Sequence, residues 1–169
     1  GPLLFLIFTN DLDEEIINKL LKFADDTKVA GAALNELEVR KLQADLNRLY
    51  QWSVDWQMLF NVEKCKIVHF GYNNRAASYT MGNKVLEVVE EERDLGVVIH
   101  QSLKSASQCA KVVKAANATL GMIKRTFITR NKSTLMQLYK ALVRPKLEFC
   151  VQAWRPYLQR DIDLLEKVP

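Results

Sequence analysis

The sequence has few cysteines and no long apolar run, and these two absences exclude whole classes of protein. Its three cysteines, Cys65, Cys109 and Cys150, lie far apart with no C-x-x-C spacing. This pattern predicts neither a disulfide framework nor a zinc site, and a reducing, intracellular setting is the default expectation. No apolar run approaches the roughly 20 residues that span a bilayer, and the stretch from Leu3 to Phe8 is too short and lacks a preceding basic flank. We therefore expect neither a membrane protein nor a secreted one.

The first position also lacks a methionine and any polar lead-in. Gly1 opens straight into the apolar segment GPLLFLIF. We therefore expect this chain to be cut from something longer. Hydrophobic residues make up 49% of its 169 residues. That is enough for one packed core, or for one compact lobe with a smaller satellite.

Acidic residues are scarce in the last part of the chain. Residues 1–100 hold 11 Lys/Arg and 16 Asp/Glu, whereas residues 101–169 hold 13 and 4. A basic terminal part favours a polyanionic partner, because phosphate contacts gain free energy from counterion release. A solvated basic surface is the alternative, and charge alone leaves both open.

Hydrophobic spacing predicts a mixed first part. Residues 1–16 fit a mostly buried helix, with Leu4, Ile7, Phe8 and Leu12 at helical spacing. Residues 20–24 and 27–33 fit two strands of a hairpin that turns at Asp25-Asp26.

A long helix and several strands are predicted to follow that hairpin. Asn35 is expected to cap a helix reaching about Phe60, with Leu42, Leu46, Leu49 and Trp56 on one face. Strands are predicted at 65–71, 85–89 and 95–100, with a tight turn at Gly82-Asn83.

From about Lys104 the pattern becomes helical. The first helix has one face formed by Ala106, Ala110, Val113, Leu120, Ile123 and Phe127. A second helix, capped by Ser133, is predicted to stop before Pro145, and a third covers residues 161–167. We predict the α+β class, with a small α+β lobe at 1–101, an all-helical basic lobe at 102–169 and a joint near 101–105.

Phe23-Ala24-Asp25-Asp26 is the strongest candidate for chemistry. Two adjacent carboxylates on a tight hairpin can hold divalent cations close to a phosphate, as two-metal phosphoryl and nucleotidyl transfer requires. Such oxygen ligands suit magnesium. An Asp-Asp pair taken alone is more often an ordinary turn, because aspartate tolerates turn conformations and hydrogen-bonds locally.

The order of the neighbouring motifs strengthens this interpretation. GPLLF, NDL, FADDTK, WSVDWQMLFNVEKCKIVHFG and RDLGVVIH follow one another, and LYKALVRPKLEFCVQAW and DIDLLEKV lie near the end. Together they resemble the reverse transcriptases of non-LTR retrotransposons, of the LINE-type, jockey-like group. The resemblance covers essentially the whole chain. It implies part of a polymerase palm, with helices packed on a small antiparallel sheet, followed by a helical thumb-like subdomain.

The resemblance also assigns roles to single residues. It makes Asp25 the metal-binding aspartate of the Y/F-x-D-D motif and Asp26 its catalytic companion, and it gives Lys64 a role in assisting the incoming nucleotide. Leu95-Gly96-Val97 resembles the hairpin that grips the primer end, where Gly96 permits close backbone approach. The plain alternatives are a surface lysine at Lys64 and a core strand with one glycine.

Basic residues on and just after the first helix of the second lobe would contact the template–primer backbone. They are Lys111, Lys114, Lys124, Arg125, Arg130 and Lys132. The resemblance further implies magnesium, with manganese as a substitute, and an RNA template, a DNA primer and deoxynucleotides as substrates. It places the protein in the nucleus or cytoplasm as part of an element ribonucleoprotein. Oligomeric state cannot be inferred.

One part of the family's active site is missing from the sequence. In this family another metal-binding aspartate lies on a strand upstream of the segment that begins here, together with the fingers, and neither is present. We therefore expect the family's RNA-directed DNA polymerase activity to belong to a parent protein and this chain alone not to extend primers. Two alternatives stay open: a non-catalytic nucleic-acid-binding module, and an inert transposon relic that folds poorly.

Overall fold

A computed structural model describes residues 1–128 and 131–168 and divides the chain into two compact units, Gly1–Val89 and Glu90–Pro169. The division falls before the joint expected near residues 101–105. Strands β7 (Glu91–Asp94) and β8 (Val97–His100) belong to the second unit because β8 packs on its first helix. The backbone N–H of Val98 also donates to the Gln108 side chain, at 2.9 Å. Each unit is described by itself below.

The first unit has a short helix, a hairpin, a long helix and two further pairs of short strand segments. Its elements are α1 (Pro2–Phe8), β1 (Lys19–Phe23), β2 (Asp26–Ala30), α2 (Glu36–Asp55), the 3₁₀ turn η1 (Val62–Lys64), β3 (Lys66–Ile67), β4 (Thr80–Met81), β5 (Lys84–Val85) and β6 (Glu87–Val88). The pairs β1–β2 and β4–β5 are antiparallel, whereas β3–β6 is parallel. The predicted hairpin at Gly82-Asn83 is confirmed, because Met81 pairs with Lys84.

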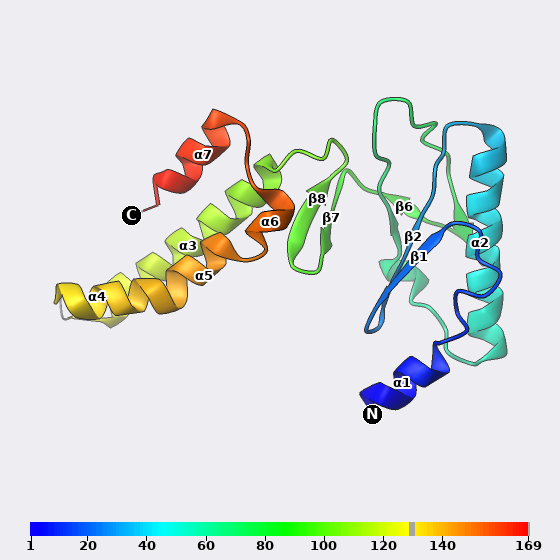
Figure 1. Ribbon diagram of the computed structural model, residues 1–169, viewed down its shortest axis with the longest axis horizontal. Helices are drawn as coiled ribbons and strands as arrows, with labels where there is room; N and C mark the ends of the chain where they lie inside the picture. The colour runs from blue at the N-terminus through cyan, green and yellow to red at the C-terminus, as the bar shows by residue number, and fades with distance from the viewer. Residues whose placement is uncertain (129–130, 169) are drawn as a thin grey trace. The chain divides into compact units, whose positions relative to one another are not determined.

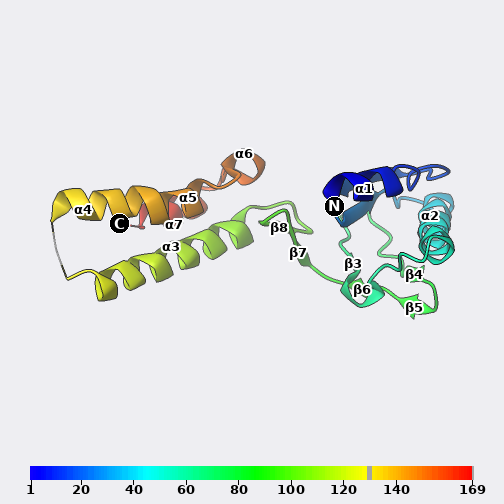
Figure 2. The same cartoon turned by 90° about the horizontal axis from the view of Figure 1, so that it is seen from below.

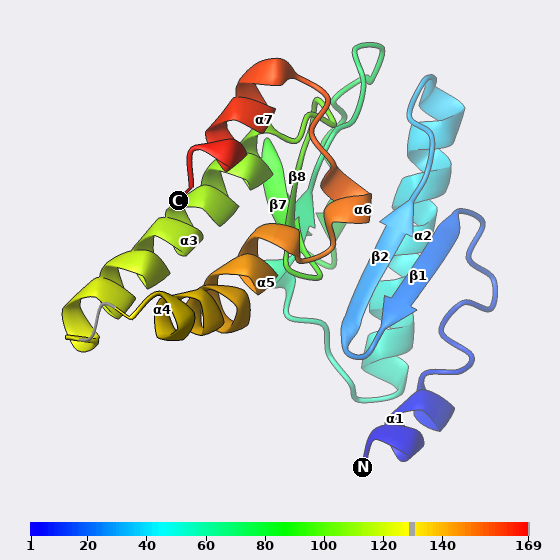
Figure 3. The ribbon, with the colours of Figure 1, turned by 60° about the vertical axis from the view of Figure 1, so that its left-hand side comes forward.

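The core of the first unit is formed by α2, by the β1–β2 hairpin and by the segment around β4 and β5. The hairpin lies alongside α2 (Figures 1 and 3). Side chains alternate across a strand, so Leu20 and Val29, which are cross-strand partners, share the face that packs on this core. The predicted cap of α2 is confirmed: Asn35 accepts a hydrogen bond from the backbone N–H of Glu38 at 3.0 Å. Leu49 is fully buried, and Leu42 and Leu46 pack beside it.

Two expectations for this unit are wrong. The first helix ends at Phe8 and has no buried residue: Leu4 is 69% exposed and Ile7 is 64% exposed, because the contacts of this helix with the rest of the unit are made at its end, by Phe8. Leu12, beyond the helix, is buried. Helix α2 ends at Asp55 rather than near Phe60, because Gln57 takes a left-handed φ of +54° that breaks the helical pattern.

The second unit is a strand hairpin followed by helices. Its elements are β7, β8, α3 (Ala106–Thr126), α4 (Lys132–Leu138), the π-helical segment η2 (Tyr139–Val143), α5 (Arg144–Glu148), α6 (Val151–Trp154) and α7 (Gln159–Glu166). The segments η2 and α5 run back along α3 and α7 packs on it (Figures 1 and 2). The buried face of α3 is formed by Gln108, Cys109, Val112, Ala116, Thr119 and Ile123, so it is rotated from the predicted face.

The helix predicted to stop before Pro145 instead continues through it. Proline lacks an N–H and its ring clashes with the carbonyl four residues earlier, so a regular helix cannot pass it undisturbed. Here the chain widens into η2, where the N–H of Arg144 donates to the carbonyl of Tyr139, five residues back. The cap of the preceding helix is Asn131 rather than Ser133, since Asn131 Oδ1 accepts from the Ser133 N–H at 2.8 Å.

The predicted α+β class is confirmed at the level of mixed helices and small sheets. The predicted strand at 65–71 is reduced to Lys66–Ile67, and β7 was not predicted. Across residues 1–128 and 131–168, the helices are too short or too polar for any of them to cross a bilayer.

Candidate active site

The two candidate aspartates lie at the tip of the β1–β2 hairpin. Phe23 pairs with Asp26, so Ala24 and Asp25 form a two-residue turn and Asp26 opens the return strand. Ala24 has a left-handed φ of +50°. That conformation costs an L-residue roughly 1–2 kcal/mol, and such strain persists where the surrounding structure imposes it. The tip is therefore held in place by contacts elsewhere in the hairpin.

Both carboxylates are available to a ligand. Asp25 and Asp26 are exposed, and neither carboxylate makes a hydrogen bond or ion pair with another described residue. Carboxylate oxygens are the donors that magnesium prefers. Within the described part of the chain, however, no group of three or more His, Cys, Asp or Glu side chains is arranged to hold a metal ion. The donor set fits a magnesium ion in kind and supplies only part of its coordination.

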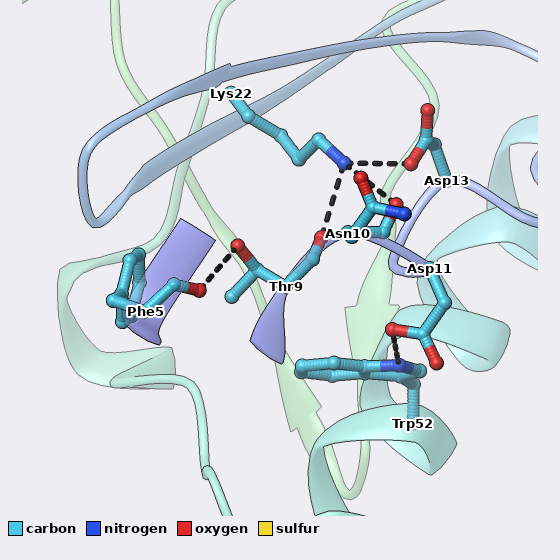
Figure 4. A network of polar contacts seen from close by, with 7 residues as sticks. All are labelled: Phe5, Thr9, Asn10, Asp11, Asp13, Lys22 and Trp52. Atoms are coloured by element: carbon cyan, nitrogen blue, oxygen red, sulfur yellow. Dashed lines mark hydrogen bonds and ion pairs between the residues drawn. The ribbon is translucent and has the colours of Figure 1, made fainter. Parts of the chain in front are cut away.

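Lys22 fixes the base of this tip to the segment that follows α1 (Figure 4). Its ammonium group donates to the carbonyls of Thr9 at 3.1 Å and Asn10 at 3.3 Å, and to Asp13 Oδ1 at 2.6 Å. The hydrogen bond from Lys22 holds the pKa of the exposed Asp13 carboxyl below its ordinary value. Since Lys22 lies one residue before Phe23, these contacts restrain the strand that ends at the aspartates.

Trp52 of α2 and Trp56, which follows this helix, contact the end of α1 and the segment after it. Trp52 Nε1 donates to Asp11 Oδ1 at 3.3 Å, as Figure 4 shows. The ring of Phe8 meets Trp52 and Trp56 edge-on, with centroids 6.0 and 5.3 Å apart. Trp52 and Trp56 thus pack against the end of α1.

Asp45 holds the segment that leads into β1. This fully buried carboxylate on α2 accepts from the N–H of Ile17 at 3.0 Å, from the N–H and side-chain amide of Asn18 at 2.8 Å each, and from Arg48 at 3.1 Å. Arg48 also donates to the carbonyl of Glu15 at 2.6 Å. Burial alone would raise the pKa of Asp45, but these donors hold it below the ordinary value. The carboxylate therefore stays charged and fixes the start of the hairpin.

Lys64 is not brought to the aspartates by any interaction. It ends η1, its side chain is exposed, and it makes no hydrogen bond or ion pair to Asp25 or Asp26 in the residues that the structure describes. Its predicted role with the incoming nucleotide remains a prediction.

Leu95-Gly96-Val97 forms the tip of the β7–β8 hairpin in the second unit. Asp94 pairs with Val97, so Leu95 and Gly96 are the two turn residues, with left-handed φ of +46° and +91°. This is the pattern of a type I′ turn, in which leucine is unusual and glycine is favoured. The Leu95 side chain is 47% exposed. A Cβ on Gly96 would lie 2.9 Å from Phe149 Cε1, so this glycine also serves close packing within its own unit.

The predicted basic residues divide between two helices. One side of α3 carries Lys111, Lys114 and Arg125, whose separations are close to whole helical turns. Lys114 and Arg125 lie opposite the buried face of the helix, and Lys111 lies at its edge. Lys124 lies about a quarter turn from Arg125, and Lys132 is the first residue of α4. Arg130 lies outside the described residues. Three of the six candidates thus form a positive stripe along α3, in which about three helical turns separate Lys114 from Arg125.

Sequence reasoning missed the two residues that position the hairpin. Asp45 falls on the apolar stripe of α2, three residues after Leu42 and four before Leu49, and a carboxylate in that place is a signal of a satisfied buried charge. Lys22 faces the same side as Leu20 in the strand. The signals were present, but their partners lie far away in the sequence.

Comparisons with known proteins agree with these motifs. The family model described as reverse transcriptase (RNA-dependent DNA polymerase) matches residues 1–136. An RNA-directed DNA polymerase from mobile element jockey of Drosophila melanogaster is 25% identical over 170 aligned residues, and the corresponding protein of Drosophila funebris is 26% identical over 167. Each alignment covers 91% of this chain but 18% of the relative, so the chain spans about a fifth of the relatives' length. No solved structure matches the chain significantly.

Proposed function

Because this chain belongs to the reverse transcriptase family, of the jockey-like non-LTR type, we propose that it serves RNA-directed DNA synthesis by a mobile element. The observation that carries this proposal is the hairpin that exposes the Asp25 and Asp26 carboxylates at its tip. Contacts of Lys22 with Asp13 and of Asp45 with Asn18 restrain the first strand of this hairpin and the segment that leads into it. The first unit would form part of the palm. The second unit would begin with the primer-gripping hairpin and continue as a thumb-like helical region.

Asp25 and Asp26 would hold divalent metal ions, which reverse transcriptases use. Magnesium, when bound, would stabilise the charge that develops on the phosphate oxygens during nucleotidyl transfer. The contribution of this chain is to present two carboxylates without competing hydrogen bonds, on a turn that its neighbours keep in a strained conformation. Lys64 would assist the incoming nucleotide, as the resemblance implies.

Alone, this chain should not extend primers. Two carboxylates without a third in the described residues bind a pair of metal ions poorly. Polymerases also depend on positioning and electrostatic stabilisation, which two carboxylates alone would supply only in part.

Primer extension on an RNA template with magnesium or manganese tests this expectation. The chain is compared with its Asp25→Ala, Asp26→Ala form, and we expect no extension from either. Extension that disappears in the double variant would show that two carboxylates suffice and would overturn the expectation of inactivity, while supporting the assignment of the site.

The stripe on α3 gives a separate test of template–primer binding. Three phosphate contacts predict a slope of log K against log[salt] of roughly −2 to −3. Filter binding to an RNA–DNA duplex should show this slope, and Lys114→Gln, Arg125→Gln should make it shallower by about 2. A control, Lys41→Gln, Arg75→Gln, removes the same charge from exposed sites of the first unit. Undetectable duplex binding, or equal effects of the two double variants, would contradict the role of the stripe.

A further inference from the structure

The second unit contains a cavity lined by both apolar and positively charged side chains, and the proposed role in polymerisation does not account for this lining. Its volume is about 470 Å³, within the range of small-molecule sites. Its walls come from the β7–β8 hairpin, α3, η2 and α5. The apolar part of the lining includes Ala115, Ala141, Leu142, Pro145 and Phe149, and the cationic part is Arg93, Lys111 and Lys146.

The three cations are not neutralised by the protein. Lys146 donates to the Thr119 hydroxyl at 2.7 Å, and Lys111 lies 3.5 Å from the carbonyl of Gly96. These oxygens are neutral, so they restrain the ammonium groups without cancelling their charge. The guanidinium of Arg93 makes no side-chain hydrogen bond or ion pair in the part of the chain that is described.

Lys146 is held in advance of any ligand. The Thr119 hydroxyl that accepts from Lys146 donates in turn to the carbonyl of Ala115, at 3.0 Å. The chain of hydrogen bonds therefore fixes the ammonium group beside a wall of the cavity, while its other N–H donors remain available. Such pre-organisation lowers the entropic cost of binding an anion.

The apolar side chains that line the cavity are also partly exposed. Phe149 is 51% exposed and Leu142 is 39% exposed, although both line the cavity. Covering such surface with an apolar body is favourable, and an aromatic ring can stack on Phe149. One wall is formed by η2, and π-helical segments inside helices are frequent at functional sites.

We propose that this cavity binds a small aromatic phosphate monoester, with the phosphate among Arg93, Lys111 and Lys146 and the ring against Phe149 and Leu142. Three positive charges match the nearly doubly charged phosphate better than a single carboxylate, and lysine and arginine are its usual protein partners. The same chemistry is present in a free mononucleotide-like ligand and in a nucleotide within a strand. The three positive charges favour the free ligand, because a phosphate monoester carries nearly two negative charges whereas a phosphodiester within a strand carries one. The site does not depend on the chain copying RNA.

The test uses the full 169-residue chain and 2-naphthyl phosphate as the probe. In ¹H–¹⁵N NMR titrations, we expect saturable shifts at the amides of Gly96, Ala115 and Leu142. Inorganic phosphate and 2-naphthol, each carrying half of the probe's chemistry, should both bind at least about tenfold more weakly.

Two variants and one matched control locate the binding. Lys146→Gln keeps a hydrogen-bonding group beside Thr119 but removes the charge and should weaken binding about tenfold. Ala115→Leu fills the cavity and should abolish binding. Lys140→Gln removes a charge from η2 outside the cavity lining and should leave the affinity within about twofold. The dispersion of the NMR spectrum shows that each variant is folded.

Several results would overturn the proposal. These are unchanged affinity in the Lys146 and Ala115 variants, shifts that saturate elsewhere, or 2-naphthol binding as tightly as its phosphate. A short oligonucleotide that displaces the probe at concentrations well below those of a free mononucleotide would assign the cavity to a strand, and would also overturn it.

Discussion

Replacing Asp45 tests how the hairpin with the two aspartates is held. The Asp45 carboxylate is fully buried and accepts hydrogen bonds from Ile17, Asn18 and Arg48. Asp45→Ala leaves the backbone N–H groups of Ile17 and Asn18 without their acceptor, whereas the Arg48 side chain is 41% exposed and keeps the Glu15 carbonyl as a partner. At about 1–3 kcal/mol for each unsatisfied donor, the substitution should lower the free energy of unfolding by about 2 to 4 kcal/mol. Asp45→Asn keeps one oxygen and the shape, and should cost about 2 kcal/mol. Either loss is a large share of the stability of a small unit.

Urea unfolding followed by tryptophan fluorescence measures this change. A Trp154→Phe background leaves only Trp52 and Trp56, which report on the first unit. The control is Asp55→Asn at the exposed end of the same helix, where the carboxylate accepts from Gln51 at 2.7 Å. We expect the control to change stability by less than about 0.5 kcal/mol. Equal effects of Asp45→Asn and Asp55→Asn would refute the anchoring role.

The pH dependence of Asp45 gives an independent check. Its pKa is lower in the folded chain than in the unfolded chain, so the unfolded state binds the proton first as the pH falls. The stabilisation is therefore complete above the unfolded pKa of about 3.9 and is lost as the pH falls through the folded pKa. Asp45→Asn should make the acid limb of the stability profile shallower. An acid limb identical to that of the unsubstituted chain would contradict the assignment.

Three further substitutions test single conformational features by urea unfolding. Gly96→Ala should destabilise the second unit by roughly 2–3 kcal/mol, because Gly96 has a left-handed φ and the added Cβ would lie 2.9 Å from the Phe149 ring. Gly71 has a φ of +83° but no neighbour within 4 Å, so Gly71→Ala should cost only about 1 kcal/mol. Equal costs would exclude the ring contact as a cause. Leu95→Asn should stabilise by about 0.5–1 kcal/mol, because asparagine tolerates the type I′ turn, and a loss would argue against that turn. Asn35→Ala should cost about 1 kcal/mol, and no change would mean that the cap of α2 contributes nothing.

Local signals in the sequence predicted local structure well. Asn35 caps α2, and Gly82-Asn83 turns between β4 and β5, because both residue preferences act within a few positions. The adjacent aspartates were also placed correctly at a hairpin tip, although the turn itself is Ala24-Asp25.

Features set by distant contacts were missed or misplaced. Apolar spacing predicted a buried first helix, but burial depends on what covers a helix, and Leu4 and Ile7 are exposed. Pro145 predicted a helix end, yet the helix continues past it into α5 through the π-helical segment η2, and both η2 and α5 pack along α3. The contacts of Lys146 with Thr119 join positions 27 residues apart, a separation at which local sequence pattern carries no information.

Manganese-induced broadening of NMR signals tests the central claim most directly. Mn²⁺ titrated into the ¹⁵N-labelled chain should broaden the amides of Ala24, Asp25 and Asp26 at lower concentrations than those of the acidic run Glu90-Glu91-Glu92, which serves as an internal control. Asp25→Asn, Asp26→Asn should remove the effect at the hairpin and leave it at the control run. Equal broadening at both places, or no change in the double variant, would contradict the role of this hairpin as a metal-binding element of a reverse transcriptase.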